Sequence, residues 1–240
     1  MKLFSKFSAL TLLAFVLLIF TSCGEITPKG DLTDKTVALE SIESIKLNGN
    51  YRLFYVLSSN NEIYIESYPN IINNLSIKQN KGLLTIEEKR PTDMVDFYNV
   101  TIFSPSVPKE IKVGGAVEFS ISGALQGEQI KINLLENAKF MGGIDMKTTQ
   151  LEMKDSSRAN FSGSTQSAEI KMGDTAHLIA PYWNVNKLSL SSSEGPYIEI
   201  NVKDSLKGEA KNTSKLLIYG EAVNQLKADK TVTLDRKNRN

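Results

Sequence analysis

The sequence contains very few of the side chains that carry metal and acid–base chemistry. Its 240 residues include one Cys, one His and one Trp. One Cys cannot form an intramolecular disulfide or a cysteine-rich zinc site. One His excludes multi-histidine metal sites and leaves little room for proton transfer near neutral pH. We therefore expect no metal site, no cofactor and no catalytic residue.

An excess of positive charge is also missing. The chain has 28 Lys and Arg against 27 Asp and Glu, a formal net charge of +1. Proteins dedicated to nucleic acids need clustered Lys and Arg to displace counterions, so this class is excluded. The hydrophobic fraction of 41% nevertheless allows the chain to bury a core.

The N-terminal segment has the layout of an export signal. Lys2 and Lys6 precede an apolar run over residues 9–20, which is too short for a comfortable membrane span. Thr21, Ser22 and Cys23 follow and resemble the bacterial lipobox, in which the Cys is lipidated and becomes the first mature residue. We expect a lipoprotein signal peptide over residues 1–22 and a membrane anchor on Cys23. The alternative is ordinary signal cleavage beside an incidental Cys.

The polar segment over residues 23–36, with Pro28 and two Gly, is typical of a tether. Residues 37–108 then alternate between apolar and polar side chains in short runs bounded by turn signals, as β-strands do. No sustained helical stripe is present, so we expect little helix. These strands are irregular, and we expect them to form an N-terminal β region that caps the second half of the chain.

A repeat occupies that second half. A short strand of the form apolar, usually Lys, apolar recurs seven times between Ile111 and Ala228, at intervals of 18–21 residues. Each copy is followed by a turn of small polar residues and a second apolar strand. A fixed period of this length indicates stacked supersecondary units. It predicts an all-β solenoid of two-stranded repeats over residues 109–236, followed by a polar tail over 237–240. The alternative is an antiparallel sandwich with evenly spaced strands.

Several of these motifs together resemble one protein family. They are the lipobox, the turn Leu47-Asn48-Gly49-Asn50, the segments at residues 82–86 and 100–102, and Leu217-Ile218-Tyr219-Gly220. This combination resembles the DUF2807 proteins, described as auto-transporter adhesins with a head GIN domain and typically secreted or lipid-anchored in Bacteroidetes. The resemblance implies a right-handed β-helix-like fold, no known catalytic residues, a role in adhesion and a homotrimeric assembly.

Catalytic interpretations of individual residues are weak. His177 lies between two residues expected to point inward, so we expect it to be a solvated strand residue. Five carboxylates lie on consecutive repeats without sharing a repeat position, so we expect them to be isolated solvated charges: Asp145, Glu152, Asp155, Glu169 and Asp174.

Two groups of residues are candidate ligand contacts. Five lysines occupy the same place in the repeat motif and predict a vertical basic ladder: Lys112, Lys131, Lys171, Lys207 and Lys227. The ladder is either a stripe for anionic ligands or a solvated surface that blocks aggregation. The second group is aromatic: Tyr182 and Trp183 in a loop between repeats, and Tyr197. Trp183 either contacts a ligand or packs over an open edge of the core.

These observations predict a non-enzymatic lipoprotein of the cell envelope. The leading function is adhesion, or the binding of a glycan or protein, at the outer membrane. One alternative is a structural or scaffolding lipoprotein that faces the periplasm. The other is a polysaccharide-active solenoid enzyme, which would need clustered carboxylates on one face.

Overall fold

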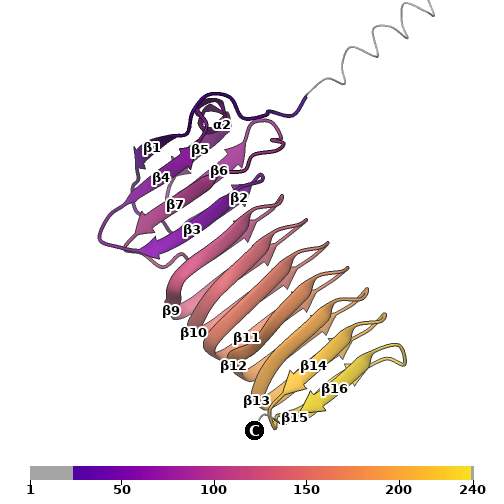
Figure 1. Ribbon diagram of the computed structural model, residues 1–240. Helices are drawn as coiled ribbons and strands as arrows, with labels where there is room; N and C mark the ends of the chain where they lie inside the picture. Colours follow the sequence, from indigo (N-terminus) through magenta and orange to yellow (C-terminus); the bar gives the residue numbers. More distant parts are fainter. Residues whose placement is uncertain (1–23, 239–240) are drawn as a thin grey trace, which may run out of the picture.

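The computed structural model describes residues 24–238. Sixteen strands form one continuous sheet that winds into an elongated stack of coils (Figure 1), and the one short helix among the described residues is α2 (Pro69–Asn74). Neighbouring coils pair in parallel, which an antiparallel sandwich does not allow. The all-β solenoid predicted from the repeats is therefore confirmed.

Five long strands make the regular part of the solenoid, namely β9 (Glu118–Leu134), β10 (Lys139–Met153), β11 (Arg158–Met172), β12 (His177–Ser192) and β13 (Tyr197–Ala210). Each strand bends around most of one coil, and a four-residue turn leads to the next coil. The second strand of each predicted repeat thus runs on without interruption into the first strand of the following one. Gly123 and Gly163 have left-handed φ of 94° and 100° and lie at or beside register shifts between neighbouring coils.

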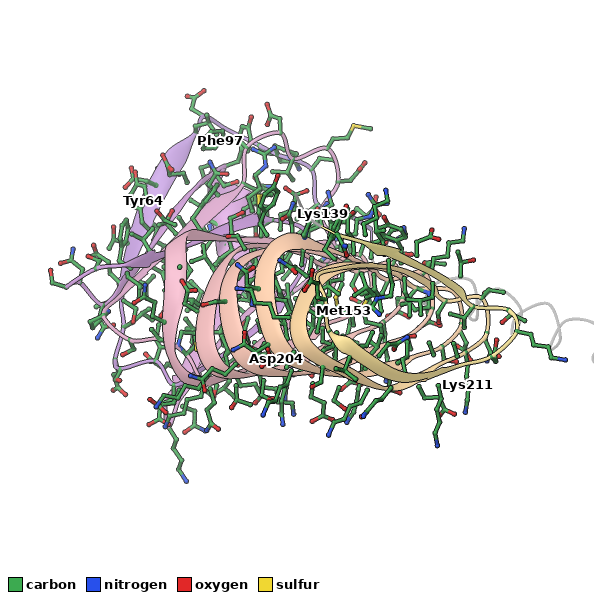
Figure 2. All side chains as sticks on the ribbon, turned by 90° about the horizontal axis from the view of Figure 1, so that it is seen from below. Tyr64, Phe97, Lys139, Met153, Asp204 and Lys211 are labelled. Atoms are coloured by element: carbon green, nitrogen blue, oxygen red, sulfur yellow. The ribbon has the colours of Figure 1, made fainter. Side chains whose placement is uncertain are left out.

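Viewed along the stack, the coils superpose as a flattened ring (Figure 2). Met153 lies inside this ring and is buried, whereas Lys139 lies on its outside and is exposed. The core is the apolar column between the two flat sides of the ring. Because side chains alternate along a strand, one residue in two points into this column.

One stack of aromatic rings runs through five successive coils. The ring centroids of neighbouring coils are separated by 6.2, 4.9, 5.2 and 5.3 Å along the series Tyr55, Phe119, Phe140, Phe161 and Trp183. These separations fall in the range favoured by aromatic pairs, which contribute about 0.5–1.5 kcal/mol each beyond burial.

The N-terminal region contributes coils of its own to the stack. Its strands are β1 (Thr33–Ala38), β2 (Ser44–Asn48), β3 (Arg52–Leu57), β4 (Glu62–Ser67), β5 (Leu75–Asn80), β6 (Leu83–Glu88), β7 (Asn99–Ser104) and β8 (Glu110–Val113). The coil formed by β2 and β3 is inserted between the later coil of β6 and β7 and the coil of β8 and β9. The remaining edges of β6 and β7 pair with antiparallel β5 and β4, and β1 pairs with the far edge of β4. We call β1, β4, β5, α2 and the loop between β6 and β7 the cap, whereas β2, β3, β6, β7 and β8 belong to the solenoid.

The opposite end of the solenoid is formed by β14 (Lys215–Tyr219), β15 (Val223–Ala228) and β16 (Thr233–Lys237). β16 pairs with β14 alone, and its other edge is open. The guanidinium of Arg236 donates to the carbonyl of Ala222 at 2.7 Å, and charged Asp235 and Lys237 flank it. Charged side chains on an edge strand discourage pairing with another chain.

The segment expected to be a tether is folded. Ile26 is half-buried and forms a parallel bridge with Thr92, and β1 begins at Thr33. The polar composition of this segment suggested a free linker, but the backbone groups of the segment pair with those of the cap. Cys23 and the predicted signal peptide lie outside the described residues.

Candidate ligand-binding face

The five lysines of the predicted ladder do not align. Register pairs Lys112 with Asn133, Asn133 with Glu152, and Glu152 with Lys171. Lys131 belongs to a second column of paired residues, where its neighbours are Glu110 and Gln150. Lys207 lies in this second column too, opposite Ser189. Lys227 is opposite Glu209, in the column of Lys112. The lysines point outward as expected, but they fall in two columns and alternate with Glu, Gln, Asn and Ser.

Carboxylates also neutralise much of this surface. The Glu110 carboxylate lies 3.3 Å from the Lys112 ammonium and 3.5 Å from that of Lys131. Lys171 is 3.0 Å from Glu169, and this hydrogen bond raises the pKa of Lys171. A continuous basic stripe for anionic ligands is therefore absent from this part of the described chain.

Trp183 is a core residue and not a surface contact. Its side chain is 0% exposed, its ring meets Phe161 edge to face, and its indole nitrogen donates to the hydroxyl of Thr165. Extra residues in β12 explain this placement, because the register with β13 shifts between Ala180 and Asn184. The chain bulges there and turns the indole inward.

The other two aromatic candidates have different surroundings. Tyr182, the neighbour of Trp183, is 66% exposed on the outer surface of β12. Tyr197 is half-buried, and its hydroxyl donates to Glu199 at 3.3 Å; burial and this carboxylate raise the pKa of Tyr197. Tyr182 thus presents most of its side chain to solvent, whereas Tyr197 belongs to a polar pair on the surface.

A groove of about 300 Å³ runs across four coils, from β9 to β12. Each of β9 to β12 contributes residues from its first three positions, and we call this feature the β9–β12 groove. Its lining comprises Glu118, Phe119, Ser120, Lys139, Phe140, Met141, Arg158, Ala159, Asn160, His177 and Ile179.

The ridges of the groove are formed by one column of outward-pointing side chains. Register stacks Ser120, Met141, Asn160 and Ile179 in that order. Short polar side chains alternate with long apolar ones, so Met141 and Ile179 form two ridges with Asn160 between them. Met141 is 60% exposed and Ile179 is 42% exposed. Two such ridges so close together leave apolar surface in contact with water.

A second column lines the groove with charged and polar groups. Register stacks Glu118, Lys139, Arg158 and His177 beside the apolar ridges. Glu118 and Lys139 form an ion pair at 2.6 Å. The Nδ1 atom of His177 lies 2.8 Å from the carbonyl of Thr175, and its ring tilts against Tyr197. His177 is half-buried rather than fully solvated.

The carboxylates do not gather into a catalytic cluster, but two of them share a repeat position that sequence spacing missed. Asp155 accepts a hydrogen bond from the backbone N–H of Glu136 at 2.8 Å, and Asp174 accepts one from the N–H of Asp155 at 3.0 Å. Glu136, Asp155 and Asp174 all have left-handed φ, between 55° and 59°. Each carboxylate thus caps the turn of the preceding coil, which is a structural task.

Residues 24–238 offer neither a metal site nor a membrane-spanning helix. No group of three or more His, Cys, Asp or Glu side chains in this range could hold a metal ion. None of the helices there has the length and apolar character needed to cross a bilayer.

Solved structures share this architecture. A protein from Bacteroides fragilis, described as "a putative adhesin", superposes with a TM-score of 0.80 at 15% identity, covering 89% of this chain and 100% of that one. A "putative adhesin" from Parabacteroides distasonis gives a TM-score of 0.73 at 17% identity, with 89% and 100% coverage. A "Putative lipid binding protein" from the same species gives 0.72 at 13% identity, with the same coverage. At these identities the likeness concerns the fold alone.

No curated protein matches the chain. Residues 42–222 match the family DUF2807, described as "Putative auto-transporter adhesin, head GIN domain". The match leaves β1 outside, begins just before β2 and runs through the regular coils to the residue before β15. The chain therefore belongs to the DUF2807 family, as its turn motifs suggested.

Proposed function

We propose that this protein is a non-enzymatic binding module of the bacterial cell envelope, anchored through a lipid on Cys23, whose contact surface is the β9–β12 groove. The observation that carries the proposal is the pair of apolar ridges, Met141 and Ile179, left in water beside Arg158. Met, Arg and aromatic residues are enriched where proteins bind one another. The adhesin description of the family agrees with this assignment.

The chemistry of the groove favours a polypeptide ligand over a glycan. The exposed ridges are aliphatic, whereas sugars stack on exposed aromatic faces, and the aromatic rings of the lining, Phe119 and Phe140, are 1% and 2% exposed. A protein segment with an apolar side chain beside a carboxylate would match Ile179 and Arg158. Flexible Met141 adapts to different apolar shapes.

Binding to purified proteins tests this proposal. The folded chain is immobilised and presented with a panel of extracellular-matrix and bacterial surface proteins, and with a glycan array. The test variant is Ile179→Glu and the matched control is Leu135→Glu, because both side chains are 42% exposed but Leu135 lies outside the groove. We expect at least one protein ligand whose binding weakens tenfold or more in Ile179→Glu alone. Binding restricted to glycans, equal binding by both variants, or no binding at all would refute the proposal.

Protease shaving of intact cells decides where the groove is displayed. Digestion in intact cells is expected for an adhesin at the surface. Protection until lysis would favour the scaffolding alternative in the periplasm. The adhesion component of the proposal would then be wrong, even if the groove still binds an envelope protein.

A further inference from the structure

The chain is fixed to the cap from its first described residue. The carbonyl of Gly24 accepts a hydrogen bond from the Arg90 guanidinium. The N–H of Ile26 donates to the carbonyl of Pro91 at 2.9 Å, and the N–H of Asp93 donates to the carbonyl of Ile26 at 3.1 Å. Ile26 also packs against the core. The segment therefore forms a short extra edge along the loop between β6 and β7.

A second set of contacts holds the following residues to α2. The Asn70 side chain accepts the N–H of Lys29 at 2.9 Å and donates to the carbonyl of Thr27 at 2.8 Å. β1 begins at Thr33, opposite Ser67 of β4. No stretch between Gly24 and β1 is long enough to act as a flexible linker.

This arrangement restricts the position of an anchor on Cys23. The Cα atom of Cys23 lies only about 3.8 Å from that of Gly24, because the two residues are consecutive. Acyl chains on that Cys would draw it to the bilayer interface. Gly24 and the Arg90 loop must then lie at the same interface, since nothing flexible separates them.

The cap also carries the apolar surface that such a position would cover. Met94, in the loop between β6 and β7, is 83% exposed and has a left-handed φ of 52°. Leu32, just before β1, is 54% exposed. A non-glycine residue rarely adopts the left-handed conformation of Met94, and here it projects an apolar side chain into water. Both residues belong to segments that adjoin the pinned chain.

We propose that the cap rests directly on the phospholipid surface and holds the solenoid end-on, with its axis rising from the membrane. This inference rests on the lipid anchor of the proposed function and adds its geometry. The pinned segment and its loop carry charges of both signs, Lys29, Asp31, Arg90 and Asp93 among them. Contact therefore needs no anionic lipid, and Met94 inserts among the headgroups.

End-on attachment has a measurable height. Eleven strands follow one another along one side of the stack from β1 to β16. At about 4.8 Å a step they span about 48 Å, whereas a solenoid lying flat would form a layer of about 20 Å, two sheets with their outer side chains. β9 to β12 lie in the middle of the stack, away from the cap (Figure 1), so the β9–β12 groove then lies well above the lipid.

Neutron reflectometry of the reconstituted lipoprotein tests the orientation. The full protein is purified from membranes, acylation of Cys23 is confirmed by mass spectrometry of its N-terminal peptide, and the protein is placed in a supported bilayer of phosphatidylcholine. We expect a protein layer of about 48 Å with no gap of water between protein and headgroups. A flat layer of about 20 Å, or a water gap beneath the protein, overturns the inference while leaving the binding function intact. An unmodified Cys23 overturns the anchor itself.

Variants separate a rigid attachment from a loose one. Insertion of a twelve-residue Gly/Ser linker between Cys23 and Gly24 is expected to open a water gap and broaden the layer. Met94→Glu is expected to lift the cap from the headgroups, whereas Val223→Glu, a 63% exposed residue at the far end of the stack, should change nothing. An unchanged profile for both the linker insertion and Met94→Glu contradicts the proposal.

Discussion

The indole N–H of Trp183 donates a hydrogen bond to the hydroxyl oxygen of Thr165, 3.1 Å away in the interior of the solenoid. The same hydroxyl lies 3.0 Å from that of Thr149. All three side chains are buried, with exposures of 0%, 2% and 0%. Three successive coils thus satisfy one another's buried polar groups, and this allows the apolar core to hold an indole.

Loss of this hydrogen bond should destabilise the fold. Thr165→Val keeps the shape of the side chain but leaves the indole N–H and the Thr149 hydroxyl without their partner. We expect the free energy of unfolding to fall by about 1–3 kcal/mol. Urea denaturation followed by Trp183 fluorescence measures the change. Thr233→Val, on exposed β16, should stay within about 0.5 kcal/mol of the unsubstituted chain, and an equal loss in both variants would contradict the assignment.

The aromatic stack should be the most sensitive part of the core. Phe140 lies between Phe119 and Phe161, with centroids at 4.9 and 5.2 Å. Phe140→Ala leaves a cavity between two rings, and we expect a loss of about 3–5 kcal/mol in thermal or urea unfolding. Phe54→Ala removes a ring that is 39% exposed on the outer surface, so its cost should be much smaller. Comparable losses in the two variants would contradict the assignment of Phe140 to a tightly packed core.

The turn ladder provides a third test. The carboxylate of Asp155 accepts the N–H of Glu136, and the residue itself has a left-handed φ of 57°. Asp155→Ala removes the hydrogen bond and places a strained residue in the turn, so we expect a loss of about 1–2 kcal/mol. Asp155→Asn keeps an acceptor oxygen and tolerates this conformation, so it should recover most of the stability. If Asn and Ala behave alike in urea unfolding, the hydrogen bond is not what stabilises the turn.

The alternation of side chains made the strands and the solenoid predictable, but it left the register between coils open. A shift of two residues keeps every side chain on its own face and moves it to another column. The motif Ile130-Lys131-Ile132 could therefore be aligned with Ile111-Lys112-Val113, although Ile111 in fact pairs with Ile132. The lysines were correctly placed on the outside and wrongly placed in one column.

The environment of Trp183 depended on a local irregularity. Pro181 interrupts the apolar alternation, so the sequence there resembles a loop. In the structure the extra residues form a bulge inside β12, which keeps the strand continuous and turns Trp183 toward Phe161. Proline is tolerated in strands at such bulges. The β9–β12 groove could not be predicted from the sequence either. Its ridges, Met141 and Ile179, become neighbours of Asn160 only through the pairing between coils.

A half-buried carboxylate near the cap, that of Glu88, should make the free energy of unfolding depend on pH. Glu88, at the end of β6, accepts hydrogen bonds from the Thr92 hydroxyl at 2.8 Å and the Asn50 N–H at 3.1 Å, and burial raises the pKa of Glu88 above its usual value. The folded state therefore binds this proton more tightly than the unfolded state. The charged carboxylate opposes folding at neutral pH, and the opposition disappears as the pH falls through the folded-state pKa.

Glu88→Gln removes the charge and should isolate this effect. We expect the stability of the variant relative to the unsubstituted chain to be highest at pH 7 and to decline as the pH is lowered toward about 4, where the native carboxyl is protonated. Thermal unfolding at a series of pH values measures the difference. Glu87→Gln is the matched control, because Glu87 is the neighbouring residue but forms a surface ion pair with Lys46 at 2.6 Å, and its loss should slightly destabilise the chain at pH 7. A relative stability of Glu88→Gln that rises on acidification would mean that its hydrogen bonds with Thr92 and Asn50 outweigh the cost of burying its charge.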